Sequence, residues 1–75
     1  MADEPFHAEK LWKLHKLDGR IDCELRLHGE RGWEVQLFRN GAFYESRRFE
    51  LREGALRHAD VLKADLIGLG WRVEP

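Results

Sequence analysis

The sequence predicts an α+β fold: a four-stranded antiparallel β-meander with one C-terminal helix packed on one face, a two-layer ββββα domain. Between residues 10 and 49, apolar and polar residues alternate in runs that glycine-containing turns separate, which is the period of a half-buried strand. After Phe49 the apolar spacing changes to three and four, which is the period of a helix. Because the sheet must bury one face and the helix one stripe, we expect two layers around a single core.

Turn signals divide the first two-thirds of the chain into strands. Asp18-Gly19 and Asn40-Gly41 are typical of two-residue hairpins, because a type I′ turn needs positive φ at both central positions. A glycine-containing loop over residues 28–32 separates the two hairpins. We therefore expect a disordered N-terminal tail over residues 1–9, a single domain over 10–75, and strands over 10–17, 20–28, 33–39 and 42–49.

These turns also predict which residues face each other across the strands. Opposite charges and two aromatic rings then meet on one face, while apolar residues meet on the other. Each such pair contributes roughly 0.2–1 kcal/mol. A slip of one residue would turn every side chain to the wrong face, so this agreement supports the register. The expected neighbours are Lys13–Glu24, His15–Asp22, Leu25–Val35, Arg26–Glu34, Glu34–Arg47 and Phe38–Phe43.

A helix is expected over about residues 52–69. Gly70 suits the left-handed C′ position, and Trp71 can supply the hydrophobic contact of a Schellman ending. Leu51 stands where an N-cap would prefer Ser, Thr or Asp. The apolar stripe of the helix is Ala55, Ala59, Leu62, Leu66 and Leu69. It should cover the sheet face that carries Trp12, Leu14, Cys23, Leu25, Val35, Leu37 and Tyr44.

Several short motifs follow one another along the chain: Trp12-x-Leu14, Asp18-Gly19-Arg20, Glu24-Leu25-Arg26, Glu34-Val35-x-Leu37, Asn40-Gly41, Ser46-Arg47-Arg48-Phe49, Ala55, Ala59 and Gly70-Trp71. With this pattern, residues 12–71 resemble a set of small uncharacterised bacterial proteins of ββββα type. That resemblance implies the fold and no activity. The strand order is also similar to that of the single-stranded-DNA-binding transcriptional coactivators of the positive-cofactor type, which are dimers. Topology alone does not determine function.

Composition excludes several classes of protein. With 36% charged and 43% hydrophobic residues, the 75-residue chain is too apolar and too patterned for a disordered segment. A net charge of −1 is not typical of a protein that coats nucleic acid, and one cysteine excludes an internal disulfide framework. The N-terminus is acidic and has no apolar run, so it does not resemble a secretory signal. We expect a cytoplasmic domain that makes no contact with membranes.

The sequence offers no strong candidate for catalysis or metal binding. The four histidines, His7, His15, His28 and His58, lack the spacing of a metal site. His15 opposite Asp22 could act as a general-base dyad, but on an open face without a nucleophile it is more simply an exposed ion pair. Cys23 is interpreted as a small buried hydrophobe. We therefore expect no catalytic residues, no metal and no cofactor.

Apolar residues outside the expected core point to a binding role instead. Phe38 and Phe43 project from the sheet face that the helix leaves uncovered, and Leu56 and Ile67 lie roughly 100–120° from the centre of the helix stripe. A small monomer rarely leaves a large apolar patch bare. We therefore predict a non-catalytic interaction domain that uses these four residues to form a homodimer or to bind a protein partner. Alternatively, the N-terminal segment with Phe6 covers the helix flank.

A second hypothesis is weak binding of single-stranded nucleic acid. Arg39, Arg47 and Arg48, near the rings of Phe38 and Phe43, resemble an aromatic platform in a basic groove. The predicted register opposes this hypothesis, because more acidic than basic residues would lie on the uncovered face and repel phosphates. That face would carry Lys13, Arg26 and Arg47 among Asp22, Glu24, Glu34 and Glu45.

Overall fold

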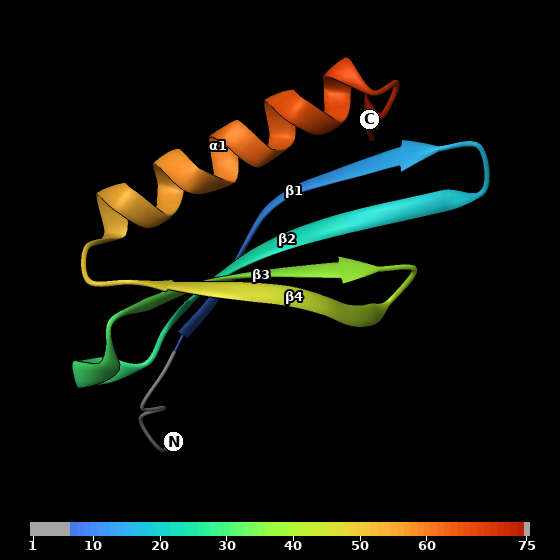
Figure 1. The fold of residues 1–75 in the computed structure, drawn as a ribbon. Coiled ribbons are helices and arrows are strands. Elements are labelled where there is room, and N and C mark those ends of the chain that lie inside the picture. Colours follow the sequence, from blue (N-terminus) through green and yellow to red (C-terminus); the bar gives the residue numbers. More distant parts are fainter. Residues whose placement is uncertain (1–6, 75) are drawn as a thin grey trace.

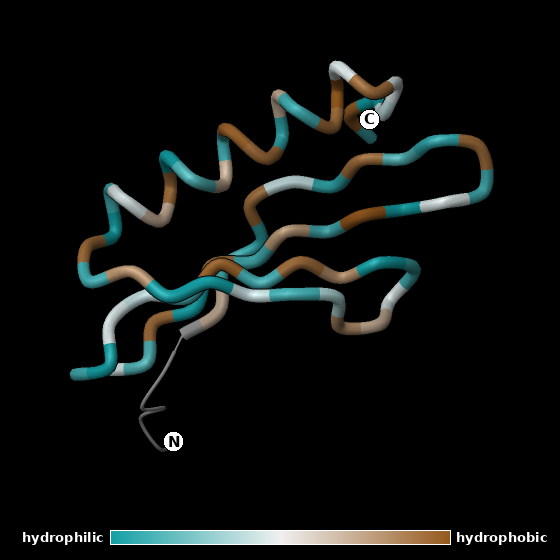
Figure 2. Tube along the Cα trace, in the orientation of Figure 1, coloured by the Kyte–Doolittle hydropathy of each residue, from teal (hydrophilic) through white to brown (hydrophobic). Residues whose placement is uncertain are grey.

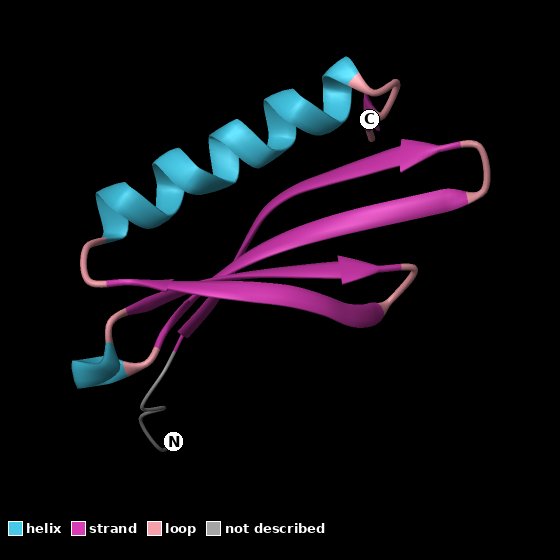
Figure 3. Ribbon diagram, in the orientation of Figure 1, coloured by secondary structure: helices cyan, strands magenta, loops and turns pink. Residues whose placement is uncertain are grey.

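One antiparallel sheet with a single helix across one face forms the domain (Figure 1). The computed structural model describes residues 7–74. Its elements are β1 (His7–Lys16), β2 (Gly19–Leu27), the 3-10 turn η1 (Gly29–Arg31), β3 (Trp33–Arg39), β4 (Ala42–Phe49), α1 (Arg52–Gly68) and β5 (Arg72–Val73). The strand order is β4-β3-β2-β1-β5 (Figure 3). The predicted α+β class is confirmed, and the short β5 is an addition to it.

The core lies between α1 and the sheet. Its buried side chains are Trp12, Leu14, Ile21, Cys23, Leu25, Val35, Leu37, Ala55 and Ala59. They come from alternate strand positions and one helix stripe, as the banding of hydropathy along the chain shows (Figure 2). The small Ala59 allows a close approach, so the indole Nε1 of Trp12 donates to the Ala59 carbonyl at 3.2 Å. No helix within residues 7–74 is long and apolar enough to cross a bilayer.

Two residues expected in the core lie outside it. Tyr44 is 57% exposed and Leu69 is 67% exposed. Leu69 is the C-cap of α1, just beyond the last helical residue, Gly68. Tyr44 lies on the outermost strand, and the helix does not cover this part of the sheet. Both predictions were wrong because periodicity shows which face a residue takes but not how far the opposing layer extends.

The first hairpin turns one residue earlier than predicted. Leu17 and Asp18 form the turn, with Leu17 at a φ of 53°, and Gly19 belongs to β2. The predicted pairs of Lys13 and His15 were therefore wrong. The ring of Trp71 lies over Gly19, where an added Cβ would sit 3.2 Å from it, so a residue with a side chain at this first position of β2 would crowd the ring. The observed pairs are Lys10–Glu24, Lys13–Asp22 and His15–Arg20.

β1 begins earlier than expected and contains a bulge. Residues 7–9 pair with β2, so the predicted disordered tail over residues 1–9 does not extend to them; residues 1–6 lie outside the described part. The register shifts between Lys10 and Trp12, which leaves Leu11 as the extra residue. As a result Glu9 faces the helix, where its carboxylate accepts a hydrogen bond from the Arg52 guanidinium at 3.0 Å.

A second bulge divides the last hairpin. The predicted neighbours Leu25–Val35, Arg26–Glu34 and Phe38–Phe43 are confirmed. The register then shifts between Leu37 and Phe38, with Tyr44 as the extra residue of β4. Arg48 therefore lies opposite Glu34, and the predicted Glu34–Arg47 pair was wrong. Arg47 is opposite the buried Val35, on the helix side of the sheet.

α1 ends in the predicted Schellman motif. The Trp71 amide donates to the Leu66 carbonyl at 3.1 Å, and the Gly70 amide donates to the Ile67 carbonyl at 3.0 Å. Gly70 has a φ of 102°. The ammonium group of Lys16 donates to the Leu69 carbonyl at 2.8 Å. These contacts fasten the end of the helix to the end of β1.

Replacing Gly70 with alanine should lower the free energy of unfolding by about 1 kcal/mol, because a Cβ is disfavoured at positive φ. Gly68→Ala is the matched control. Gly68 lies at the end of α1 with no atom within 4 Å of an added Cβ, so alanine should raise stability there through its helix propensity. Urea unfolding of both variants measures the difference. Equal stability of Gly70→Ala and wild type would contradict the motif.

Candidate binding site

The outer edge of β4 is open along the whole strand. β4 is the last strand of the sheet, and nothing within residues 7–74 pairs with its outer side. Every residue from Ala42 to Arg48 is exposed. An edge strand presents a row of unpaired N–H and C=O groups that can pair with another chain. The opposite edge is partly covered, because β5 pairs with β1 at Leu14 and His15.

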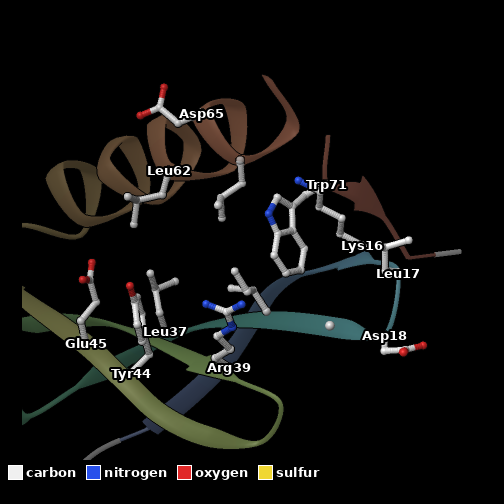
Figure 4. A pocket seen from close by; sticks show the side chains of 13 residues that line it. Lys16, Leu17, Asp18, Leu37, Arg39, Tyr44, Glu45, Leu62, Asp65 and Trp71 are labelled. Atoms are coloured by element: carbon white, nitrogen blue, oxygen red, sulfur yellow. The ribbon is translucent and has the colours of Figure 1, made fainter. Parts of the chain in front are cut away.

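A groove lies beside this edge, between α1 and the hairpin ends of the sheet (Figure 4). We call it the β4 groove. It has a volume of about 720 Å³, within the range of ligand-binding pockets. Leu62 and Trp71 point into it from the helix layer, and Leu37, Arg39 and Tyr44 point into it from the sheet.

The groove exists because α1 crosses the sheet diagonally. The helix starts close to β4, where the rings of Phe49 and His58 are 5.2 Å apart. It ends over the other edge, where Lys16 bonds to Leu69 and Trp71 packs on Gly19. The first half of β4 and the end of β3 are therefore left without cover. A helix fastened at both ends cannot close this gap without losing one of its anchors.

The bulge at Tyr44 places two opposite charges on the helix side of β4. Glu45 lies opposite the buried Leu37, as Arg47 lies opposite Val35. The guanidinium of Arg47 is 5.5 Å from the centre of the Phe49 ring. Partial burial lowers the pKa of His58, Arg47 lowers it further, and Glu45 opposes both effects. The pKa of His58 therefore responds to both charges.

Arg47→Ala should raise the pKa of His58, and Glu45→Ala should lower it, because each variant removes one of these electrostatic effects. Arg48→Ala is the matched control: the same charge is lost one residue further along, on the opposite face. NMR titration of the His58 ring measures all three. Equal shifts from Arg47→Ala and Arg48→Ala would contradict the bulge.

The sheet face that points away from α1, here called the outer face, carries a different charge balance from the predicted one. Because of the two bulges and the observed turn of the first hairpin, this face carries five basic and three acidic residues. The basic residues are Lys10, Lys13, Arg20, Arg26 and Arg48, and the acidic residues are Asp22, Glu24 and Glu34. The predicted excess of acidic residues was therefore wrong. Phe38 and Phe43 lie on the same face, edge to face, with ring centres 6.1 Å apart.

The acidic residues of the outer face are held by neighbouring side chains. The Arg20 Nε lies 3.3 Å from Asp22, and Arg26 donates to Glu24 at 3.0 Å. Nε2 of His28 is 2.7 Å from the carboxylate of Glu34. Burial alone would raise the pKa of Glu34, but hydrogen bonds from Ser46, His28 and Gln36 and the nearby His28 charge outweigh it and lower the pKa. In each of these pairs the basic side chain is more exposed than the carboxylate beside it.

The structure separates the residues predicted to form one interface. Phe38 and Phe43 lie on the outer face, whereas Leu56 and Ile67 lie on α1, across the sheet. Leu56 is partly buried against the core, so it does not lack cover as expected, and Ile67 is 44% exposed. The covering role suggested for Phe6 falls outside the described residues. That either pair contacts a partner stays a prediction.

The arginines of the nucleic-acid hypothesis are also divided. Arg39 lines the β4 groove, Arg47 faces the helix and Arg48 lies on the outer face. Glu45 was not predicted as a site residue, and Tyr44 was predicted in the core. The available signal was the weak apolar alternation of residues 42–49, because a strand with charges on its inner side is typical of an edge.

The described residues contain no group of three or more His, Cys, Asp or Glu side chains that could hold a metal ion. Burial, with a smaller effect of Glu24, raises the pKa of Cys23 to about 12, so its thiol stays protonated at neutral pH. His15 lies opposite Arg20, and the expected His15–Asp22 pair is not formed.

No protein-family model, curated protein or solved structure matches this chain. Three surfaces of the domain are open to a ligand: the outer edge of β4, the β4 groove beside it and the basic outer face.

Proposed function

We propose that this domain is a cytoplasmic, non-catalytic binding module whose ligand is an extended polypeptide segment. The segment adds to the sheet along the outer edge of β4. The observation that carries this proposal is the exposure of an eight-residue edge strand next to an apolar groove. In strand addition, main-chain hydrogen bonds supply affinity, and pockets for alternate side chains supply specificity.

The β4 groove supplies such a pocket. Its base contains the apolar side chains of Ile21 and Leu37, and Leu62 and Trp71 close it from above. Side chains of an added strand alternate between the two faces of the sheet. Those on the helix side would therefore reach the groove and the neighbouring charges of Glu45 and Arg47. A ligand with an apolar side chain at one position and charges at alternate positions fits this surface.

β4 also carries features that restrict what can pair with it. Charges and bulges are the usual means by which edge strands avoid unspecific aggregation. The bulge at Tyr44 interrupts the regular strand, which leaves Glu45–Phe49 as the segment suited to pairing. The charges within that segment favour partner strands that carry complementary charges, so the choice of partner does not depend on hydrophobicity alone.

Peptides selected from a random library for binding to the domain should shift the amide NMR signals of β4 first. N-methylation of alternate peptide amides should abolish binding for one set of positions and spare it for the other, because only one edge of the peptide bonds to the sheet. Leu62→Ala should weaken binding, whereas Val61→Ala, at an exposed position of the same helix, should not. Equal tolerance of both methylation patterns would rule out strand addition.

The outer face supports a second candidate function, the binding of single-stranded nucleic acid. The face that carries the Phe38–Phe43 pair also carries five basic residues, against three partly covered acidic residues. Exposed aromatic rings on which bases stack, together with basic residues along the backbone path, are typical of such binding. This arrangement favours phosphate binding more than the predicted face did.

Arg48→Ala should then weaken the binding of a fluorescent single-stranded oligonucleotide and reduce the slope of log K against log salt concentration by about 0.7. Arg47→Ala removes the same charge from the helix side of the same strand and should leave the slope unchanged. Fluorescence anisotropy across a salt series measures both variants. An equal response of the two variants would contradict binding on the outer face.

A further inference from the structure

We infer that the segment paired with β4 is β4 of a second copy of this chain, so that two domains form a symmetric dimer with one continuous sheet. This inference rests on the proposed strand addition and names its occupant. Most soluble homo-oligomers are two-fold dimers, and an exposed edge strand can pair with its own copy without a change of fold. What selects this occupant is the order of charges along β4.

Antiparallel pairing around Ser46 makes this edge complementary to itself. In that register Glu45 lies opposite the partner's Arg47, and the two-fold axis repeats the contact with Arg47 opposite the partner's Glu45. Both residues face the helix side in each copy, so their side chains meet on the same face of the joined sheet. Ser46, which is small and uncharged, lies on the axis.

The neighbouring registers are unfavourable. Pairing around Glu45 places that carboxylate opposite its own copy, and pairing around Arg47 or Arg48 does the same for a guanidinium. Like charges directly opposite each other destabilise a strand pair. A register shifted by a single residue would pair helix-side with outer-face positions, which the pleat forbids. Among centres from Glu45 to Arg48, only Ser46 brings opposite charges together.

The dimer also accounts for exposed apolar surface at both ends of β4. Antiparallel strands bring the end of the partner's β4, followed by the partner's Leu51, toward the start of the first copy's β4. Leu51 is 67% exposed, and the β4 groove with Tyr44 lies at that start. Both helices would lie on one face of the joined sheet, because the two-fold axis runs perpendicular to it.

Charge reversal tests this register. By sedimentation, wild type should have a mass close to twice 8.9 kDa. Glu45→Arg alone places arginines opposite each other, and Arg47→Glu alone places glutamates opposite each other, so each variant should be monomeric. An equimolar mixture of the two should recover the dimer, because every contact is again between opposite charges. The double variant Glu45→Arg/Arg47→Glu should also dimerise.

Glu30→Arg and Arg31→Glu are the controls, since they make the same charge changes in the exposed turn η1 and should remain dimeric. Recovery in the mixture excludes misfolding as the cause of dissociation. A wild-type monomer at every concentration, or a dimer unaffected by the reversals, would overturn the inference. A monomer whose β4 still binds selected peptides would leave the proposed function intact, whereas a monomer that binds none would overturn both.

Discussion

The packing of Trp71 on Gly19, with the bond from Lys16 to the Leu69 carbonyl, determines which surfaces of this domain stay open. A short connection joins the start of α1 to β4, at one edge of the sheet. The contacts of Trp71 and Lys16 hold the end of α1 near the opposite edge. The helix must therefore run diagonally. Its two buried alanines let the helix pack closely on the sheet along this diagonal path. The parts of the sheet beside the path, the β4 groove and the outer edge of β4, remain uncovered.

Two bulges then decide which charges face which layer. The bulge at Leu11 turns Glu9 toward Arg52 at the start of the helix, and the bulge at Tyr44 turns Glu45 and Arg47 toward the helix side. One extra residue in a strand reverses the faces of every residue beyond it. The outer face thereby carries Arg48 in place of Arg47 and loses the carboxylate of Glu45. The edge of β4 acquires the alternating charges on which strand pairing would depend.

A domain of this size has a thin core and few ways to protect its surface. α1 covers most of the apolar residues of the sheet, and two arginines of the outer face, Arg20 and Arg26, form ion pairs with Asp22 and Glu24 on the same strand, β2. The outer edge of β4 has no neighbouring strand within residues 7–74. Association along this edge would join two small sheets into a larger one, and would extend the core without any further element in the chain.

Local sequence determined the α+β class, the bounds of β3 and β4, the Phe38–Phe43 pair and the Schellman ending at Gly70, because alternation, turn residues and helix spacing act between near neighbours. The first turn lies at Leu17-Asp18, one residue before the predicted position, and Gly19 packs against Trp71, more than fifty residues further along the chain. The bulge at Tyr44 and the open edge of β4 depend on strand register and on the path of the helix. The sequence pattern therefore indicated which residues alternate, but only the tertiary contacts decided which side of β4 carries Glu45 and Arg47 and left its edge free.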